Sequence, residues 1–184
     1  ALETKRINLK LIVDLPKFAE RAAEAKLKGI GLTRIEGMIA RMGKHPLLYE
    51  KEGKLDEYSD ILKKGLSEIL KPFNQIWVRS SDIRTDEYAS LKGAPEREIN
   101  PMLGMHGIRF SLKHPEIFEA ELKAIESVAR DNLDKKVGIM FPQIISIEEV
   151  KGAKKHFDKF KTEKVQSGVM IETPASVQII DDIC

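Results

Sequence analysis

Three charged residues, Arg34, Arg79 and Glu172, stand where short apolar runs of the sequence end. A guanidinium is always charged and offers a planar fork of donors, which matches pairs of oxygens on a phosphate or a carboxylate. A single carboxylate beside such an anion can hold Mg²⁺, because this ion takes few protein oxygens and leaves positions for ligand oxygens. Together the three residues predict a site for a phosphorylated, metal-bound substrate.

The same residues also have an ordinary interpretation as members of surface ion pairs. Glu36 lies close enough in the sequence to pair with Arg34, and Asp82 could pair with Arg79. Glu172 could be a solvated residue ahead of a helix that begins with a proline. Residue type and spacing therefore leave the functional and the structural interpretation open.

Short apolar runs and amphipathic helical patterns alternate along the chain and must position these residues. Strands are expected at residues 7–13, 30–33, 75–79, 137–142 and 168–172. Helices are expected at residues 14–29, 55–70, 115–133 and 146–160, and from Pro174 onward. Asp14 and Ser146, the latter with Glu149 in a capping box, are predicted to cap two of these helices. Residues 80–100 are polar and predict a long loop of the kind that often carries function.

Strands that are apolar throughout and separated by helices indicate a parallel sheet in an α/β fold. In such folds ligands bind at the carboxyl ends of the strands, where the three charged residues lie. We expect an incomplete (β/α)8 TIM barrel, because only five or six βα units fit into 184 residues and a closed barrel needs eight. The last strands would then be missing. An open doubly wound sheet, which needs no missing strands, is the alternative.

Composition narrows the classes of function. The chain carries 31 Lys and Arg against 29 Asp and Glu, and its net charge is only +2. Balanced charge argues against a nucleic-acid or membrane-binding role, and no segment reaches the roughly 20 apolar residues of a membrane span. One cysteine and the lack of an apolar leader in residues 1–10 predict a cytoplasmic location. Without repeats or linkers, residues 1–184 are expected to form one domain.

Four ordered segments make the sequence recognisable. Residues 29–36 (GIGLTRIE) resemble the G-x-G-L-x-R-x-E segment of the PEP-utilising enzymes, which include phosphoenolpyruvate synthase, pyruvate phosphate dikinase and enzyme I of the sugar phosphotransferase system. Residues 78–82 (VRSSD), 100–104 (NPMLG) and 168–175 (GVMIETPA) match further segments in the same order. The resemblance covers essentially the whole chain. It implies that residues 1–184 are the N-terminal two-thirds of the family's C-terminal barrel, which binds phosphoenolpyruvate or pyruvate.

The resemblance also implies roles for individual residues. Arg34 and Arg79 match two substrate arginines that hold the transferring phosphoryl group, and Glu172 matches the first Mg²⁺ ligand. The second metal-ligating Asp, the proton-donor Cys and the phosphohistidine belong to segments that this chain lacks, so no catalytic residue is expected within it. A phosphohistidine domain of the same parent chain is therefore an expected partner. His106 stands where relatives usually carry Arg, and Arg109 is a nearby candidate to replace it.

Residues 79–88 (RSSDIRTDEY) favour one branch of the family. They are most similar to the synthase and lack the Pro-Pro-Leu-His-Glu run of the dikinase and the Gly-Gly-Asp-Lys run of enzyme I. The resemblance implies a parent enzyme that converts ATP, pyruvate and water to AMP, phosphoenolpyruvate and phosphate, and a fragment that is inactive alone. An enzyme I-like or dikinase-like phosphotransferase and a non-catalytic assembly module are the alternatives. The strand edges of an incomplete barrel also predict a homo-oligomer.

Overall fold

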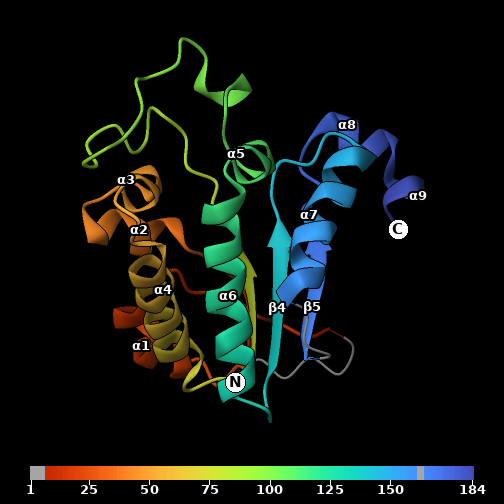
Figure 1. The fold of residues 1–184 in the computed structure, drawn as a ribbon. Helices are drawn as coiled ribbons and strands as arrows, with labels where there is room; N and C mark the ends of the chain where they lie inside the picture. The colour runs from red at the N-terminus through yellow and green to blue at the C-terminus, as the bar shows by residue number, and fades with distance from the viewer. Residues whose placement is uncertain (1–6, 161–163) are drawn as a thin grey trace.

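A computed structural model describes residues 7–160 and 164–184 (Figure 1). Within them the chain forms one parallel sheet of five strands in the order β1-β2-β3-β4-β5. The strands are β1 (Leu11–Ile12), β2 (Gly29–Arg34), β3 (Gln75–Arg79), β4 (Lys136–Phe141) and β5 (Val165–Val169). Each strand pairs with the next one along the chain, whereas a doubly wound sheet reverses its strand order at a switch point. The fold is therefore α/β with the arrangement of an incomplete (β/α) barrel.

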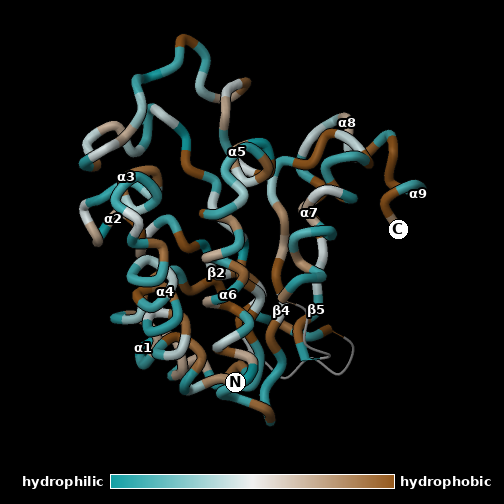
Figure 2. Tube along the Cα trace, in the orientation of Figure 1, coloured by the Kyte–Doolittle hydropathy of each residue, from teal (hydrophilic) through white to brown (hydrophobic). Residues whose placement is uncertain are grey.

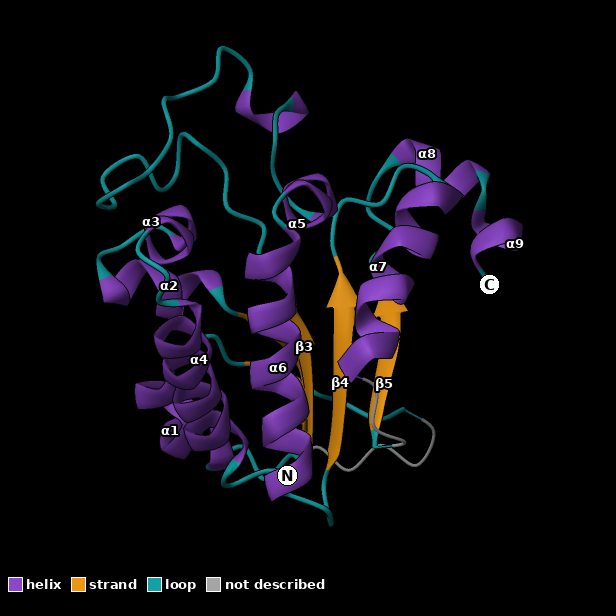
Figure 3. Cartoon of the chain, in the orientation of Figure 1, coloured by secondary structure: helices purple, strands orange, loops and turns teal. Residues whose placement is uncertain are grey.

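Helices follow the strands along the chain, and the longest of them lie against one face of the sheet (Figure 3). In chain order they are η1 (Pro16–Phe18), α1 (Ala19–Ala23), α2 (Glu36–Met42), α3 (Pro46–Lys51), α4 (Leu55–Leu70), η2 (Pro101–Leu103), α5 (Ile108–Lys113), α6 (Pro115–Asp131), α7 (Ile147–Phe160), α8 (Pro174–Gln178) and α9 (Ile180–Ile183). In the part of the chain that the structure describes, no helix is long and apolar enough to cross a membrane.

The hydrophobic core lies between the sheet and the helices α4 and α6. Ile76 and Val78 of β3 are buried in this layer, and strand alternation turns Trp77 and Arg79 to the opposite face. The buried apolar side chains of the two helices recur at spacings of three and four residues: Tyr58, Leu62, Leu66, Ile69, Ile117, Phe118, Leu122 and Ile125. Hydrophobic positions recur along these elements, whereas the long loop after β3 is mostly hydrophilic (Figure 2).

A close approach of two strands fixes the sheet beside Arg79. Trp77 of β3 stands opposite Gly138 of β4 in the parallel register. A Cβ added at Gly138 would lie 2.5 Å from the Trp77 ring, which is well inside contact distance. Only glycine therefore lets the indole of Trp77 cover β4 at this point, two residues before Arg79 at the end of β3.

Several predicted elements are confirmed. Strand 75–79 and helix 55–70 have the expected bounds, and a helix begins at Pro174. The segment 80–100 between β3 and η2 contains neither a helix nor a strand, as a long loop requires. These elements carry strong local signals, namely a continuous apolar run, a long amphipathic stripe and an N-terminal proline.

The two outermost strands differ from their predicted bounds. The strand predicted at residues 7–13 is reduced to Leu11–Ile12, and Ile7 and Leu9 before it are exposed. As an edge strand, β1 has a neighbour on one side only, so fewer of its residues pair. The strand predicted at residues 168–172 is shifted to Val165–Val169. Glu172 therefore lies three residues past the strand and not at its end.

Two helix predictions also change in detail. The helix predicted to reach residue 29 ends at Ala23, and Lys26 then adopts a left-handed backbone conformation with φ of 57°. The capping box is confirmed in one half, because the Glu149 N–H donates to Ser146 Oγ at 3.3 Å. In the other half, the Glu149 carboxylate accepts the N–H of Ile145 at 2.7 Å. The predicted partner in that half was the N–H of Ser146.

Candidate functional site

A cavity of about 470 Å³ opens at the carboxyl ends of the first three strands. Its charged lining residues are Asp14, Arg34, Glu36, Arg79, Asp82, Arg84, Glu87 and His106, and Tyr88, Met102 and Gln143 also line it. The structure thus brings both predicted arginines into one cavity. Carboxylates accompany them in similar number, so each cation is held in place before any ligand binds.

Arg34 enters this cavity from the last position of β2 and is bound to Asp14, which follows β1. Asp14 accepts the backbone N–H of Arg34 at 2.8 Å, its Nε–H at 2.9 Å and its Nη2–H at 2.5 Å. Asp14 is therefore a partner of Arg34 and does not cap the following helix, whose N-cap is Leu15. The ion pair considered for Arg34 with Glu36 is replaced by this one. Because 47% of the Arg34 side chain is exposed, a ligand can reach it.

Arg79, the last residue of β3, is held more deeply. Its Nη2–H donates to Glu36 Oε1 at 2.9 Å, and its Nη1 lies 3.7 Å from Asp82 Oδ2. The pairing with Asp82 is confirmed, although Glu36 makes the shorter contact. Only 14% of the Arg79 side chain and 5% of the Glu36 side chain are exposed. Burial raises the pKa of Glu36, and the charge of Arg79 works against that rise.

Four buried polar atoms at the ends of β2 and β3 have no hydrogen-bond partner among the described residues. They are Thr33 Oγ1, Glu36 Oε2, Arg79 Nε and Ser80 Oγ. Buried polar groups are normally paired, and an unpaired one costs roughly 1–3 kcal/mol. Their occurrence together beside the cavity marks a place where polar contacts from outside the protein fit the structure.

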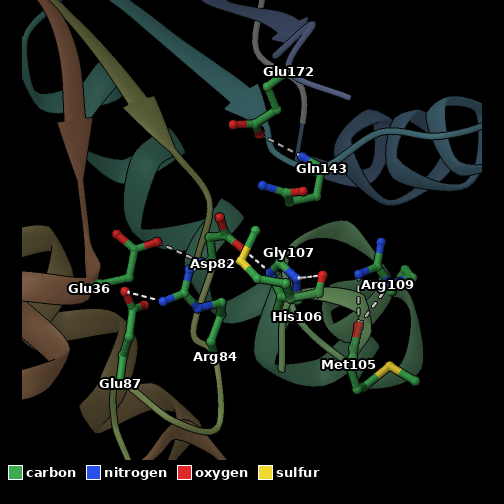
Figure 4. A network of polar contacts seen from close by, with 12 residues as sticks. Glu36, Asp82, Arg84, Glu87, Met105, His106, Gly107, Arg109, Gln143 and Glu172 are labelled. Carbon is green, nitrogen blue, oxygen red and sulfur yellow. Dashed lines mark hydrogen bonds and ion pairs between the residues drawn. The ribbon is translucent and has the colours of Figure 1, made fainter. Parts of the chain in front are cut away.

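Glu172 follows β5 and binds a residue that lines the cavity. Its Oε1 accepts the backbone N–H of Gln143 at 2.8 Å, and Gln143 lines the cavity (Figure 4). Gln143 has a φ of 60°, a left-handed conformation that is uncommon for residues other than glycine and is often found at functional sites. Among the residues that the structure describes, no group of three or more His, Cys, Asp and Glu could hold a metal. Mg²⁺ commonly takes one or two protein carboxylates together with water and ligand oxygens, and Glu172 offers one such carboxylate beside a residue of the cavity lining.

Sequence reasoning missed Arg84 and misjudged Arg109. The long loop brings Arg84 into the cavity, where it donates to Glu87 Oε1 at 2.8 Å and to Asp86 Oδ1 at 3.2 Å (Figure 4). Its position in a polar loop directly after Arg79 was the signal that could have found it. Arg109 instead donates twice to the carbonyl of Gly104, at 2.7 and 3.0 Å. His106 lines the cavity, and Arg109 is not among the lining residues. Arg109 therefore does not replace the arginine that relatives usually carry at position 106.

A fully buried carboxylate accepts a hydrogen bond from the segment that follows β3. Glu121 of α6 accepts the backbone N–H of Ser81 at 3.1 Å and the hydroxyl of Tyr58 at 2.9 Å. Burial raises the pKa of Glu121 to about 7, and the bonds from Ser81 and Tyr58 partly oppose the rise. Ser81 lies between Arg79 and Asp82, so this contact positions both. The signal for this contact in the sequence is a single acid on the apolar stripe of a helix.

The Glu121→Gln variant is expected to flatten the dependence of stability on pH. In the folded state the pKa of Glu121 rises from 4.5 to about 7. Between these two pH values the folded chain therefore keeps a proton on Glu121 that the unfolded chain has lost. Its free energy of unfolding therefore falls by about 3 kcal/mol as the pH rises from 4.5 through 7. Glutamine cannot ionise, and its amide can bond both Ser81 and Tyr58. Urea unfolding at several pH values measures the difference.

Glu116→Gln, on the exposed face of the same helix, is the matched control and should keep the pH dependence of the wild-type chain. An unchanged slope in Glu121→Gln would contradict the assignment of that titration to Glu121.

Fold and site together define an α/β domain with the arrangement of an incomplete barrel and an arginine-containing cavity at its strand ends. The model of the family described as PEP-utilising enzyme, PEP-binding domain, matches residues 1–184. The chain belongs to this family.

Named relatives agree with this assignment. The chain is 38% identical over 182 residues to a probable phosphoenolpyruvate synthase of Archaeoglobus fulgidus, covering 95% of the chain and 24% of the relative. It is 37% identical over 182 residues to the phosphoenolpyruvate synthase of Pyrococcus furiosus, covering 95% and 22%. A phosphoenolpyruvate-protein phosphotransferase of Buchnera aphidicola is 34% identical over 182 residues, covering 94% and 29%. The chain thus spans about a quarter of the length of the curated relatives it matches.

Proposed function

We propose that this chain is the N-terminal two-thirds of the substrate-binding barrel of a phosphoenolpyruvate synthase. The parent enzyme would convert ATP, pyruvate and water to AMP, phosphoenolpyruvate and phosphate through a phosphohistidine. The observation that carries the proposal is the placement of Arg34 and Arg79 in one cavity, in a chain 37–38% identical to proteins of that name. The chain alone would be inactive, because the phosphohistidine and the proton-donor Cys would be supplied by other parts of the parent.

In this proposal the two arginines bind and orient the transferring phosphoryl group. Arg79 is fixed by Glu36, and its guanidinium would meet the ligand in one defined orientation. Arg34 is more exposed and would release Asp14 to bind ligand oxygens. Both would offset negative charge on the equatorial oxygens as the phosphoryl group moves.

Mg²⁺ is the proposed cofactor, and Glu172 is the residue of this chain that would hold it. An ion of this kind is commonly bound by one or two carboxylates together with water and substrate oxygens, which suits a single acid that is bound to a residue of the cavity lining. When bound, the ion would supply positive charge against the enolate form of pyruvate.

The proposed partners are a phosphohistidine domain of the same parent chain and a second copy of the protein. The cavity lies at one end of the strands, where a phosphohistidine could approach the two arginines. β1 and β5 each have one neighbour in the described sheet, and Ile12 and Ile171 are exposed beside these edges. Exposed edges and apolar residues favour association with further protein.

The parent protein is expected to form AMP from ATP only when pyruvate is present. Glu172→Gln should reduce this activity about 100-fold or more, because the amide keeps the size of the side chain and removes the charge that binds the ion. The same change should remove the tightening of oxalate binding by Mg²⁺ in the chain itself. A coupled assay for AMP and isothermal titration of oxalate measure the two effects.

Glu148→Gln is the matched control, since Glu148 is an exposed acid at the start of α7 and should leave both readouts unchanged. Full activity in Glu172→Gln would refute the metal role. Phosphoryl transfer from phosphoenolpyruvate to a carrier protein without ATP would favour the enzyme I-like alternative. A requirement for inorganic phosphate would favour the dikinase-like one, and self-association without nucleotide chemistry would favour an assembly module.

A further inference from the structure

The imidazole of His106 is enclosed between two groups that accept hydrogen bonds. Its Nδ1 lies 2.6 Å from Asp82 Oδ1, and its Nε2 lies 2.8 Å from the backbone carbonyl of Met102. A carbonyl can only accept, and so can an ionised carboxylate. Both ring nitrogens must then carry a proton, so beside an ionised Asp82 the ring is an imidazolium. Only 1% of the His106 side chain is exposed, so the protein alone fixes this arrangement.

The backbone around His106 keeps the ring in this place. Gly107 has a φ of 59°, and a Cβ added there would lie 2.8 Å from Cβ of Gln143 and 3.1 Å from Asp82 Oδ1. A side chain at position 107 would therefore push apart the segments that bring His106 and Asp82 together (Figure 4). The contact is built into the turn between η2 and α5, and it faces the cavity through Asp82 and Gln143.

We propose that His106 is a positioning residue that makes anion binding in this cavity dependent on pH, with dicarboxylate or phosphate anions bound more tightly while His106 is protonated. The inference rests on the proposed anion-binding role of Arg79 and extends it. His106 does not touch the ligand. It acts through Asp82, which lies between His106 and Arg79.

The coupling follows from the charges around Asp82. Protonated His106 neutralises the carboxylate from one side, and Arg79 Nη1 remains 3.7 Å from the other side. When His106 loses its proton, Arg79 is the nearest cation left to the Asp82 carboxylate. The negative charge of Asp82 is then no longer offset by His106, so it attracts the Arg79 guanidinium more strongly. An anionic ligand must compete with this attraction when it binds Arg79. Loss of one proton therefore lowers the affinity of the cavity for a negative ligand.

The charged groups that face His106 define the direction of its titration. The hydrogen bond with Asp82 raises the pKa of His106, while burial and the charge of Arg109 on α5 lower it. Met102 on η2 contributes an uncharged carbonyl that favours the proton, and Arg79 on β3 acts on the same carboxylate. Because the net shift is upward from 6.5, the charge is present at pH 6 and is lost as the pH rises through the higher folded value.

Isothermal titration of the 184-residue chain with oxalate at pH 6.0 and 8.5, at constant ionic strength, tests the inference. Oxalate is a suitable probe because it stays doubly ionised across this range. Wild-type affinity is expected to fall about fivefold or more between the two pH values. His106→Arg should keep a positive charge beside Asp82 and reduce the change to less than twofold. His106→Gln should bind oxalate at pH 6.0 as weakly as the wild type does at pH 8.5.

A direct measurement of the ring separates positioning from general stability. Nitrogen-15 NMR of the histidine side chains, with His106→Gln to assign the signals, should show His106 protonated on both nitrogens at pH 6.0. His156→Gln is the matched control, because His156 pairs with Glu119 on the helix layer and should leave the pH dependence of binding intact.

Three results would overturn the inference. A single protonated nitrogen at pH 6.0 would remove the imidazolium, and equal oxalate affinity at both pH values in the wild type would remove the coupling. In either case the proposed function would stand as long as the chain still binds oxalate. Absence of oxalate binding at either pH would instead defeat the proposed function and this inference with it.

Discussion

Arg79→Ala is expected to abolish oxalate binding by the cavity and to destabilise the fold in the same step. The guanidinium is mostly buried against Glu36, and removing it leaves a buried carboxylate without its cation. Breaking a buried ion pair in this way typically costs about 3–5 kcal/mol. The same change deletes the planar fork that would hold the anion. Urea unfolding measures the first effect, and oxalate titration with pyruvate-dependent turnover of the parent measures the second.

A double variant separates these two effects. Arg79→Ala combined with Glu36→Gln removes the unpaired charge, so much of the lost stability should return, whereas binding and turnover should not. Arg79→Lys is the matched change that keeps the charge and loses the fork, and it should bind oxalate at least tenfold more weakly than the wild type. Recovery of oxalate affinity in the double variant would show that Arg79 serves stability alone.

The parts of the fold predicted best from the sequence are those with strong local patterns. The bounds of β3 and α4 follow from an uninterrupted apolar run and from a long amphipathic stripe, neither of which needs knowledge of distant contacts. The parallel direction of the strands follows from the regular alternation of strand and helix, whereas their sequential order distinguishes the barrel arrangement from a doubly wound sheet and needed the structure. Positions at the carboxyl ends of the strands then pointed to Arg34 and Arg79, which the structure places in one cavity.

The contacts that define the site could not be predicted in the same way, because they join residues far apart in the chain. Asp14 meets Arg34 across 20 positions, Glu36 meets Arg79 across 43, and Glu121 meets Ser81 across 40. Local spacing made Glu36 the natural partner of Arg34 and made Asp14 a helix cap. The folded sheet brings the ends of β1 and β2 together, and this proximity outweighs the local preferences.

The bounds of the two edge strands, β1 and β5, also could not be predicted from local sequence patterns. The apolar residues before β1 predict a longer strand, yet β1 contains only Leu11 and Ile12, and Ile7 and Leu9 before it are exposed. Glu172 was expected at a strand end, and the shift of β5 leaves it in the following segment, bound to the backbone of Gln143. Periodicity identifies which residues can enter a sheet, and the available neighbours decide how many do.

The two arginines also differ in how deeply they are buried, and this difference predicts effects of different size on stability when each is replaced. Arg34 is half exposed and pairs with Asp14 at the rim, whereas Arg79 is enclosed with Glu36. Exposed ion pairs typically contribute between about 0 and 1 kcal/mol to stability. Replacing Arg34 should therefore leave the fold nearly unchanged, and its effect on function can be measured without a correction for unfolding.

Arg34→Ala is accordingly expected to lower pyruvate-dependent turnover of the parent protein about 100-fold or more, with a change in the free energy of unfolding below about 1 kcal/mol. The loss follows because the remaining guanidinium cannot offset charge on both sides of a moving phosphoryl group. Arg41→Ala, an exposed arginine in the last turn of α2, is the matched control and should keep full turnover. Near-normal turnover in Arg34→Ala would reduce Arg34 to the rim partner of Asp14, and Arg79 would then be the single guanidinium required of this chain.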